Sequence, residues 1–159
     1  LDSCIYLGNL DAKRDWGHAK DYVEMQWLML QQEKPEDFVI ATGQMNSVRE
    51  FIELCAIELG WNKENKGKGI IWERTGINEI GRREDTKDVV IKIDPKYFRP
   101  TEVDQLLGDS SKARKKLNWE PKITLQQLIS EMIKEDLNEA QKESILKKKG
   151  FSIFGSQEL

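Results

Sequence analysis

A charged run in the stretch LGNLDAKRDWGHAKDYV, residues 7–23, carries the side chains in this sequence that are best suited to chemistry. Arg14, Asp15 and Trp16 stand side by side immediately before a predicted helix. The N-terminus of a helix favours anions, and the planar fork of a guanidinium suits a diphosphate. Arg14 is therefore a candidate anion-binding residue. In the alternative interpretation, Arg14 and Asp15 form a surface salt bridge and Trp16 packs into the core.

A second candidate motif is FRPTEV, residues 98–103. Pro100 holds Arg99 in an extended conformation and suits the first turn of a helix. Glu102 follows three residues after Arg99 and is able to accept hydrogen bonds from hydroxyl or ring N–H groups of a ligand. The alternative is a plain helix start in which Glu102 only complements the helix dipole.

The common catalytic and cofactor-binding motifs are absent from the sequence. It contains neither a G-x-G-x-x-G nor a G-x-x-G-x-x-G turn for the phosphates of a dinucleotide, and no tyrosine has a lysine four residues later. His18 is the only histidine, so neither a Ser-His-Asp assembly nor a His and Cys metal site can be argued. We therefore expect no catalytic residue, no cofactor-binding turn and no metal ligand in this chain.

Composition limits the classes of protein to consider. A length of 159 residues corresponds to one ordinary domain, and the net charge of −3 with mixed signs argues against a broad nucleic-acid surface. No apolar run approaches the ~20 residues that span a membrane, and no signal peptide is evident. A cytoplasmic location is expected, with Cys4 and Cys55 unpaired. The start LDSC, which lacks Met, suggests a piece cut from a longer chain.

The first half of the chain contains clear local signals for secondary structure. Helical spacing of apolar residues predicts a helix from Gly17 to about Gln32. The segment DFVIATG, residues 37–43, reads as a compact buried strand. Ser47 and Glu50 form a capping-box pattern ahead of a second helix.

In the second half, strands are expected at residues 70–74 and 88–94. The charged segment between them, residues 78–87, is typical of a solvated loop. Residues 95–109 are expected to form a loop that leads into a short helix.

Two further helices complete the expected set. A short one is capped by Asp109 or Ser110 and ends near Asn118, and a long amphipathic one opens at a second capping box, Thr124 and Gln127. Because the strands lie among helices rather than in a series of hairpins, the fold class is α/β.

Two motifs resemble one known family. The stretch from LGNLDAKRDWGHAKDYV to ATG and the stretch beginning YFRPTEV are similar to the GDP-mannose 4,6-dehydratase family of extended short-chain dehydrogenase/reductases, from about Asp2 to Lys149. The resemblance implies the conversion of GDP-mannose to GDP-4-keto-6-deoxymannose, on the route to GDP-fucose. By the same resemblance, bound NADP would take hydride from C4 of the sugar, water would leave across C5–C6, and hydride would return at C6.

The resemblance also assigns roles to residues. Arg14 would face the diphosphate of GDP, and Arg99 and Glu102 would line the same nucleotide. Asn9 and Trp16 would stand behind these contacts or serve packing. His18, on the same motif, is expected to be a structural residue at the helix start.

The resemblance implies how the chain fits into the family's fold. Residues 1–150 would be the C-terminal part of an extended Rossmann-type dehydratase. They would hold mainly the sugar-nucleotide-binding domain, with strand 38–41 and helix 47–59 returning to the Rossmann sheet and 151–159 as a tail. The NADP-binding turn and the catalytic Tyr-Lys pair would lie in the missing N-terminal part.

The sequence also allows other functions for this chain. The chain could instead be a non-catalytic module that binds nucleotide sugars, or part of another nucleotide-sugar dehydratase or epimerase. The family forms dimers and tetramers, and we expect the full-length enzyme to be a homo-oligomer of one of these kinds.

Overall fold

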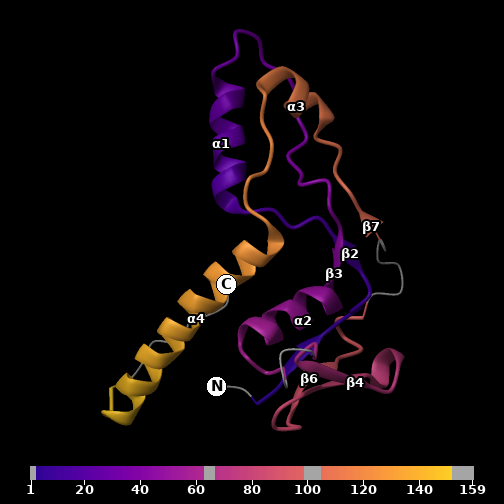
Figure 1. Cartoon of the computed structure of the whole chain (residues 1–159), viewed down its shortest axis with the longest axis vertical. Coiled ribbons are helices and arrows are strands. Elements are labelled where there is room, and N and C mark those ends of the chain that lie inside the picture. The colour runs from indigo at the N-terminus through magenta and orange to yellow at the C-terminus, as the bar shows by residue number, and fades with distance from the viewer. Residues whose placement is uncertain (1–2, 63–66, 99–104, 152–159) are drawn as a thin grey trace.

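Helix α1, Ala19–Leu30, lies beside the shorter helix α3, Ser111–Leu117, at one end of the molecule. The computed structural model describes residues 3–62, 67–98 and 105–151, and Figure 1 shows their arrangement. Buried Met25 of α1 packs against Ala113, Leu117 and Trp119. This cluster joins two segments that are almost 90 residues apart in sequence, so the fold depends on long-range packing.

Asp21 ties the start of α1 to the segment that follows α3. The buried Asp21 carboxylate accepts hydrogen bonds from the backbone N–H groups of Lys122 (3.0 Å) and Ile123 (2.9 Å). The indole N–H of Trp119 donates to the Asp21 carbonyl at 3.0 Å. These bonds satisfy polar groups that burial would otherwise leave unpaired.

A four-stranded mixed sheet forms the other end of the molecule. Its order is β1-β6-β5-β4, where β1 is Ile5–Leu7, β4 is Ile70–Glu73, β5 is Ile80–Arg83 and β6 is Val89–Ile93. Strands β1 and β6 run parallel, whereas the other neighbours are antiparallel. A 3₁₀ turn, Gly76–Asn78, connects β4 to β5.

Helix α2, Val48–Glu58, packs on this sheet. Its Ala56 forms a buried cluster with Ile70 of β4 and Ile91 of β6. Both halves of the predicted capping box are present, because the Ser47 hydroxyl accepts from the Glu50 N–H and the Glu50 carboxylate accepts from the Ser47 N–H. The expected start of this helix is thereby confirmed.

A small three-stranded sheet lies between the two ends. It has the order β3-β2-β7, with β2 at Lys13–Arg14, β3 at Asn46–Ser47 and β7 at Gln105–Leu106. Arg14 pairs with Asn46 in the antiparallel neighbour and with Leu106 in the parallel one. Arg14 is thus held between segments from distant parts of the chain.

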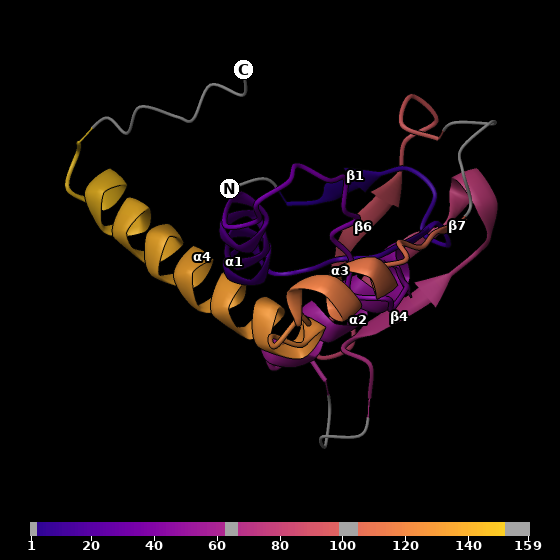
Figure 2. The ribbon, with the colours of Figure 1, turned by 90° about the horizontal axis from the view of Figure 1, so that it is seen from above.

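The long helix α4, Leu125–Lys148, begins at the second predicted capping box, Thr124 and Gln127. The first part of α4 packs against α2. Figure 2 shows its C-terminal half extending away from the rest of the molecule. Among the described residues, no helix is both long enough and apolar enough to cross a membrane.

Two expectations about secondary structure are wrong. Residues 38–41 form no strand, because no described segment pairs with them, and Val39 is 50% exposed while Phe38 and Ile40 pack toward the α1–α3 core. The charged segment 78–87 contains β5, the strand between β4 and β6. The described residues at the end of 95–109 contain the strand β7, whereas residues 99–104, where the short helix was expected to start, lie outside the described residues.

The α/β class is confirmed by the mixture of helices with parallel and antiparallel strands. The predicted first helix is confirmed with His18 as its N-cap residue, and the short helix near Ser110 is confirmed as α3. Cys4 and Cys55 are both free thiols, as expected.

Candidate nucleotide-binding site

Arg14 lines a cleft of about 480 Å³. Its NH1 donates to the Lys13 carbonyl at 2.8 Å, so part of the guanidinium is fixed along its own strand. The cleft is lined by Arg14, Asp15, Trp16, Tyr22, Ile40, Ala41, Leu106, Leu107 and Gly108. A cation, polar groups and apolar walls therefore meet in one concave surface, which is typical of a ligand site.

Asp15 anchors the segment that carries Arg14. Its Oδ1 accepts hydrogen bonds from the Thr42 N–H (2.9 Å) and the Thr42 hydroxyl (2.5 Å), and its Oδ2 accepts from the Gly43 N–H (2.9 Å). Gly43 has a φ of 79°, which a side chain would strain. The carboxylate thus fastens residues 42–43 to residues 14–16, the elbow that leads toward α1, a role beyond that of a surface salt bridge.

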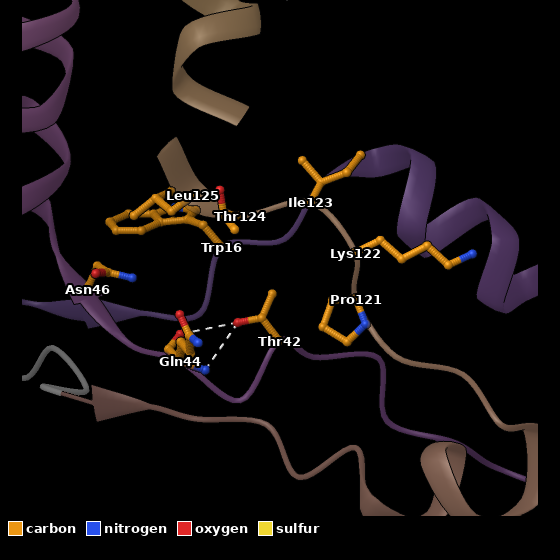
Figure 3. A pocket seen from close by; sticks show the side chains of 9 residues that line it. All are labelled: Trp16, Thr42, Gln44, Asn46, Pro121, Lys122, Ile123, Thr124 and Leu125. Atoms are coloured by element: carbon orange, nitrogen blue, oxygen red, sulfur yellow. Dashed lines mark hydrogen bonds between the residues drawn. The ribbon is translucent and has the colours of Figure 1, made fainter. Parts of the chain in front are cut away.

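Trp16 packs against helix α2. Its ring centroid lies 5.0 Å from that of Phe51, with the planes tilted by 49°. Trp16 also lines a second, smaller pocket of about 100 Å³. Figure 3 shows this pocket, which residues 42–46 and the segment 121–125 enclose together with Trp16. The packing role expected for Trp16 is present in the structure.

Tyr22 reaches the cleft from α1. Its ring lies so close to Gly17 that a Cβ at Gly17 would stand 2.3 Å from the ring atom Cε1. Burial, followed by the charges of Asp15 and Asp21, raises the pKa of the Tyr22 hydroxyl. The hydroxyl is therefore a neutral hydrogen-bond donor at pH 7. The sequence analysis did not identify it, although its position one turn into the helix after the elbow was a usable signal.

Asn9 shapes the loop before Arg14. Its Oδ1 accepts from the Asp11 N–H at 2.9 Å, which is an Asx-turn contact. The structure thus gives Asn9 a part in the bend of the chain, and a contact between Asn9 and a ligand stays a prediction.

The start of α1 is already occupied by protein groups. His18 Nδ1 accepts from the Lys20 N–H at 3.0 Å, and His18 Nε2 lies 3.3 Å from the Glu131 carboxylate. The hydrogen bond from Lys20 lowers the pKa of the Glu131 carboxyl. Asp21 adds a carboxylate in the first turn of the helix. Protein groups thus occupy this helix N-terminus, and the structural role expected for His18 is confirmed.

Arg99 and Glu102 lie outside the described residues. The residues that follow them, Gln105 and Leu106, form β7 and pair directly with β2. Leu106, Leu107 and Gly108 line the same cleft as Arg14. The segment that follows the second motif therefore meets the segment of Arg14 at this cleft, although the two are about 90 positions apart in sequence.

Comparison with known proteins decides the family. The sequence model described as GDP-mannose 4,6 dehydratase matches residues 1–132. This chain belongs to the GDP-mannose 4,6-dehydratase family. A member from Vibrio cholerae serotype O1 is 53% identical over 156 residues, which are 96% of this chain and 42% of that protein. The human GDP-mannose 4,6 dehydratase is 54% identical over 134 residues, or 84% of this chain and 34% of that protein.

This member of the family thus spans less than half the length of the curated relatives that it matches. Solved structures with a similar fold include RMD from Pseudomonas aeruginosa with NADPH (TM-score 0.59, 18% identity, 84% of this chain and 36% of that chain). UDP-glucose 4-epimerase from Thermotoga maritima with UDP-glucose is also similar (TM-score 0.61, 21% identity, 86% of this chain and 36% of that chain). These similarities confirm the α/β fold expected from the sequence.

Proposed function

We propose that this chain is the part of a GDP-mannose 4,6-dehydratase that binds the GDP of the substrate. The observation that carries the proposal is the position of Arg14, which lines a cleft of about 480 Å³ on a chain of this family. A guanidinium offers a planar fork of N–H donors that matches the oxygens of a diphosphate. The complete enzyme would remove water from GDP-mannose to give GDP-4-keto-6-deoxymannose, which leads toward GDP-fucose.

Within this proposal, the described residues bind and orient the substrate. Arg14 holds the diphosphate, and the neutral Tyr22 hydroxyl is a donor in the same cleft. Asp15 keeps residues 42–43 in place beside them through its three hydrogen bonds. Such contacts are made equally in the ground state and the transition state, so they lower KM more than they raise kcat.

NADP, which the family implies, does not fit the described helix starts. The phosphates of a dinucleotide need free N–H groups at a glycine-rich helix start. The start of α2 instead holds the Glu50 carboxylate against the Ser47 N–H, and α4 begins with the Thr124–Gln127 box. We therefore assign NADP binding to the remaining length of the enzyme. The complete enzyme is further proposed to be cytoplasmic and a dimer or tetramer.

The function is tested by incubating GDP-mannose and NADP with the complete enzyme and, separately, with the 159-residue chain. The complete enzyme is expected to form the 4-keto-6-deoxy product, and the chain alone is expected to form none. Turnover by the chain alone would overturn the division of roles. Absence of turnover by the complete enzyme would overturn the dehydratase assignment.

Arg99 and Glu102 are proposed to line the same nucleotide, and their variants test the site independently. Glu102→Gln keeps the shape and removes the charge, so KM for GDP-mannose should rise more than kcat falls. Arg99→Ala should have the same effect with a larger magnitude. A lower melting temperature with an unchanged KM would show that the motif only starts a helix, at a cost of ~0.3–1 kcal/mol.

A further inference from the structure

Arg49, the second residue of α2, connects three separate parts of the molecule. Its side chain is only 21% exposed, and it contacts the loop before Arg14, the turn before β5 and an aromatic ring of β4. We propose that Arg49 is the positioning residue that sets the place of Arg14 in the cleft. This inference rests on the proposed function, since it concerns the same diphosphate contact.

The loop before Arg14 is attached to the N-terminus of α2. The Arg49 N–H donates to the Leu10 carbonyl at 2.9 Å, and the Val48 N–H donates to the Ala12 carbonyl at 3.2 Å. The first N–H groups of a helix have no partner within the helix, so they are available for such contacts. The Arg49 side chain adds a further bond, from Nε to the Asp11 carboxylate at 2.9 Å. The three residues 10–12 are thus fixed immediately before β2.

The other end of the guanidinium is fixed by the four-stranded sheet. Its NH1 and NH2 donate to the two oxygens of Glu79, at 2.5 and 3.2 Å, and Glu79 is only 11% exposed. The Arg49 Cζ lies 4.7 Å from the centre of the Trp72 ring, in a cation–π contact. Trp72 in turn donates from its indole N–H to Glu53, one helical turn after Arg49. Arg49 is therefore clamped in one orientation.

This arrangement links the sheet to Arg14. A loop held at Leu10, Asp11 and Ala12 leads without a gap into Lys13 and Arg14, so a shift of the loop moves the guanidinium that lines the cleft. Lysine cannot replace Arg49 here, because one ammonium cannot bond to Asp11 and Glu79 in this fork geometry while its charge faces Trp72. The pair Ser47 and Glu50 would still start the helix in such a variant.

The test is a double-mutant cycle in the complete enzyme, with the dissociation constant for GDP measured by titration calorimetry. Arg49→Lys is expected to raise this constant roughly fivefold, a size typical of coupled residues. In the Arg14→Ala background, Arg49→Lys should change it by less than about twofold, because the residue through which Arg49 acts is gone.

Asp11→Asn provides a second variant that leaves the fold intact, since the Asp11 side chain is 75% exposed. It should weaken GDP binding with Arg14 present, have no effect in Arg14→Ala, and leave the melting temperature and NADP affinity unchanged. Because a purely structural role would move only the melting temperature, this pattern separates positioning from stability.

Each other outcome overturns the inference in a recognisable way. If Arg14→Ala weakens GDP but Arg49→Lys and Asp11→Asn do not, Arg49 is not a positioning residue and the proposed function stands. If the losses of GDP-binding free energy from Arg49→Lys and from Arg14→Ala add in full in the double variant, Arg49 acts independently of Arg14. If Arg14→Ala itself binds GDP normally, the diphosphate contact and the inference built on it are both wrong.

Discussion

Asp15 binds Thr42 through both the backbone and the side chain of that residue. One carboxylate oxygen accepts the Thr42 N–H at 2.9 Å and the Thr42 hydroxyl at 2.5 Å, while the other accepts the Gly43 N–H. The two residues are 27 positions apart; Asp15 lines the cleft that holds Arg14, and Thr42 lines the smaller pocket beside Trp16. The acidic residue of the elbow therefore has a structural purpose next to the proposed ligand contact.

Asp15→Asn should destabilise the protein, because the amide that replaces one carboxylate oxygen cannot accept a hydrogen bond. Losing hydrogen bonds to a charged group costs about 1.5–3 kcal/mol, and urea unfolding at pH 7 measures the change. Thr42→Val is the matched variant: it removes the hydroxyl that donates to the same charged carboxylate, keeps the backbone hydrogen bonds, and should likewise cost about 1.5–3 kcal/mol. Equal stabilities of wild type and Asp15→Asn would contradict the anchoring role.

The Glu50 carboxyl should make the folding stability of the protein depend on pH. The Ser47 N–H hydrogen bond lowers the pKa of the Glu50 carboxyl below its ordinary value of 4.5. A depressed pKa in the folded state adds stability above the ordinary value, and this stability is lost as the pH falls through the folded-state pKa. Glu50→Gln retains the capping geometry without the charge. The stability difference between wild type and this variant, measured in urea, should therefore shrink between about pH 5 and pH 3. A difference that stays constant over this range would contradict the prediction.

Exposed apolar side chains should make the isolated chain associate. Val23, Trp27 and Leu30 form an exposed stripe at helical spacing on α1, and a groove of about 350 Å³ with an almost wholly apolar lining runs between β1, β6 and α2. Such surfaces normally mark contacts with other protein segments. Sedimentation should therefore show concentration-dependent association of the 159-residue chain, and Trp27→Lys should reduce it. A monomer with a sharp melting transition would contradict this prediction.

Local signals predicted the helices well, and non-local pairing explains what was missed. The capping boxes at Ser47 and Thr124 depend on residues three positions apart, so they are readable from the sequence. Strand β5 was missed because its Arg82 and Arg83 look solvated. In the structure Arg82 pairs with Glu73 of β4, and the Arg83 guanidinium stacks over the Trp61 ring.

The candidate site was predicted only in part for the same reason. Arg14 was identified from its neighbours in sequence, and the structure places it in a cleft. Arg49 was missed, since its partners Asp11 and Glu79 lie 38 and 30 positions away. No local pattern distinguishes such an arginine from one on a solvated helix face.

The affinity of Arg14→Ala for GDP tests the central claim most directly. Titration calorimetry on the complete enzyme should show GDP and GDP-mannose weakened alike, because both contain the diphosphate. A lost charge-assisted hydrogen bond of about 1.5–3 kcal/mol raises the dissociation constant about 10- to 150-fold. Affinity for NADP should be nearly unchanged.

Two further variants serve as controls for this measurement of GDP affinity. Arg14→Lys should recover part of the affinity, since a point charge cannot reproduce the fork. Lys13→Ala removes an exposed cation from the same strand, and because successive side chains of a strand point to opposite faces it should leave GDP binding intact. Weak GDP binding in Arg14→Ala with normal binding in Lys13→Ala is the result that the account predicts. Full GDP affinity in Arg14→Ala would contradict it and leave Arg14 with a packing role alone.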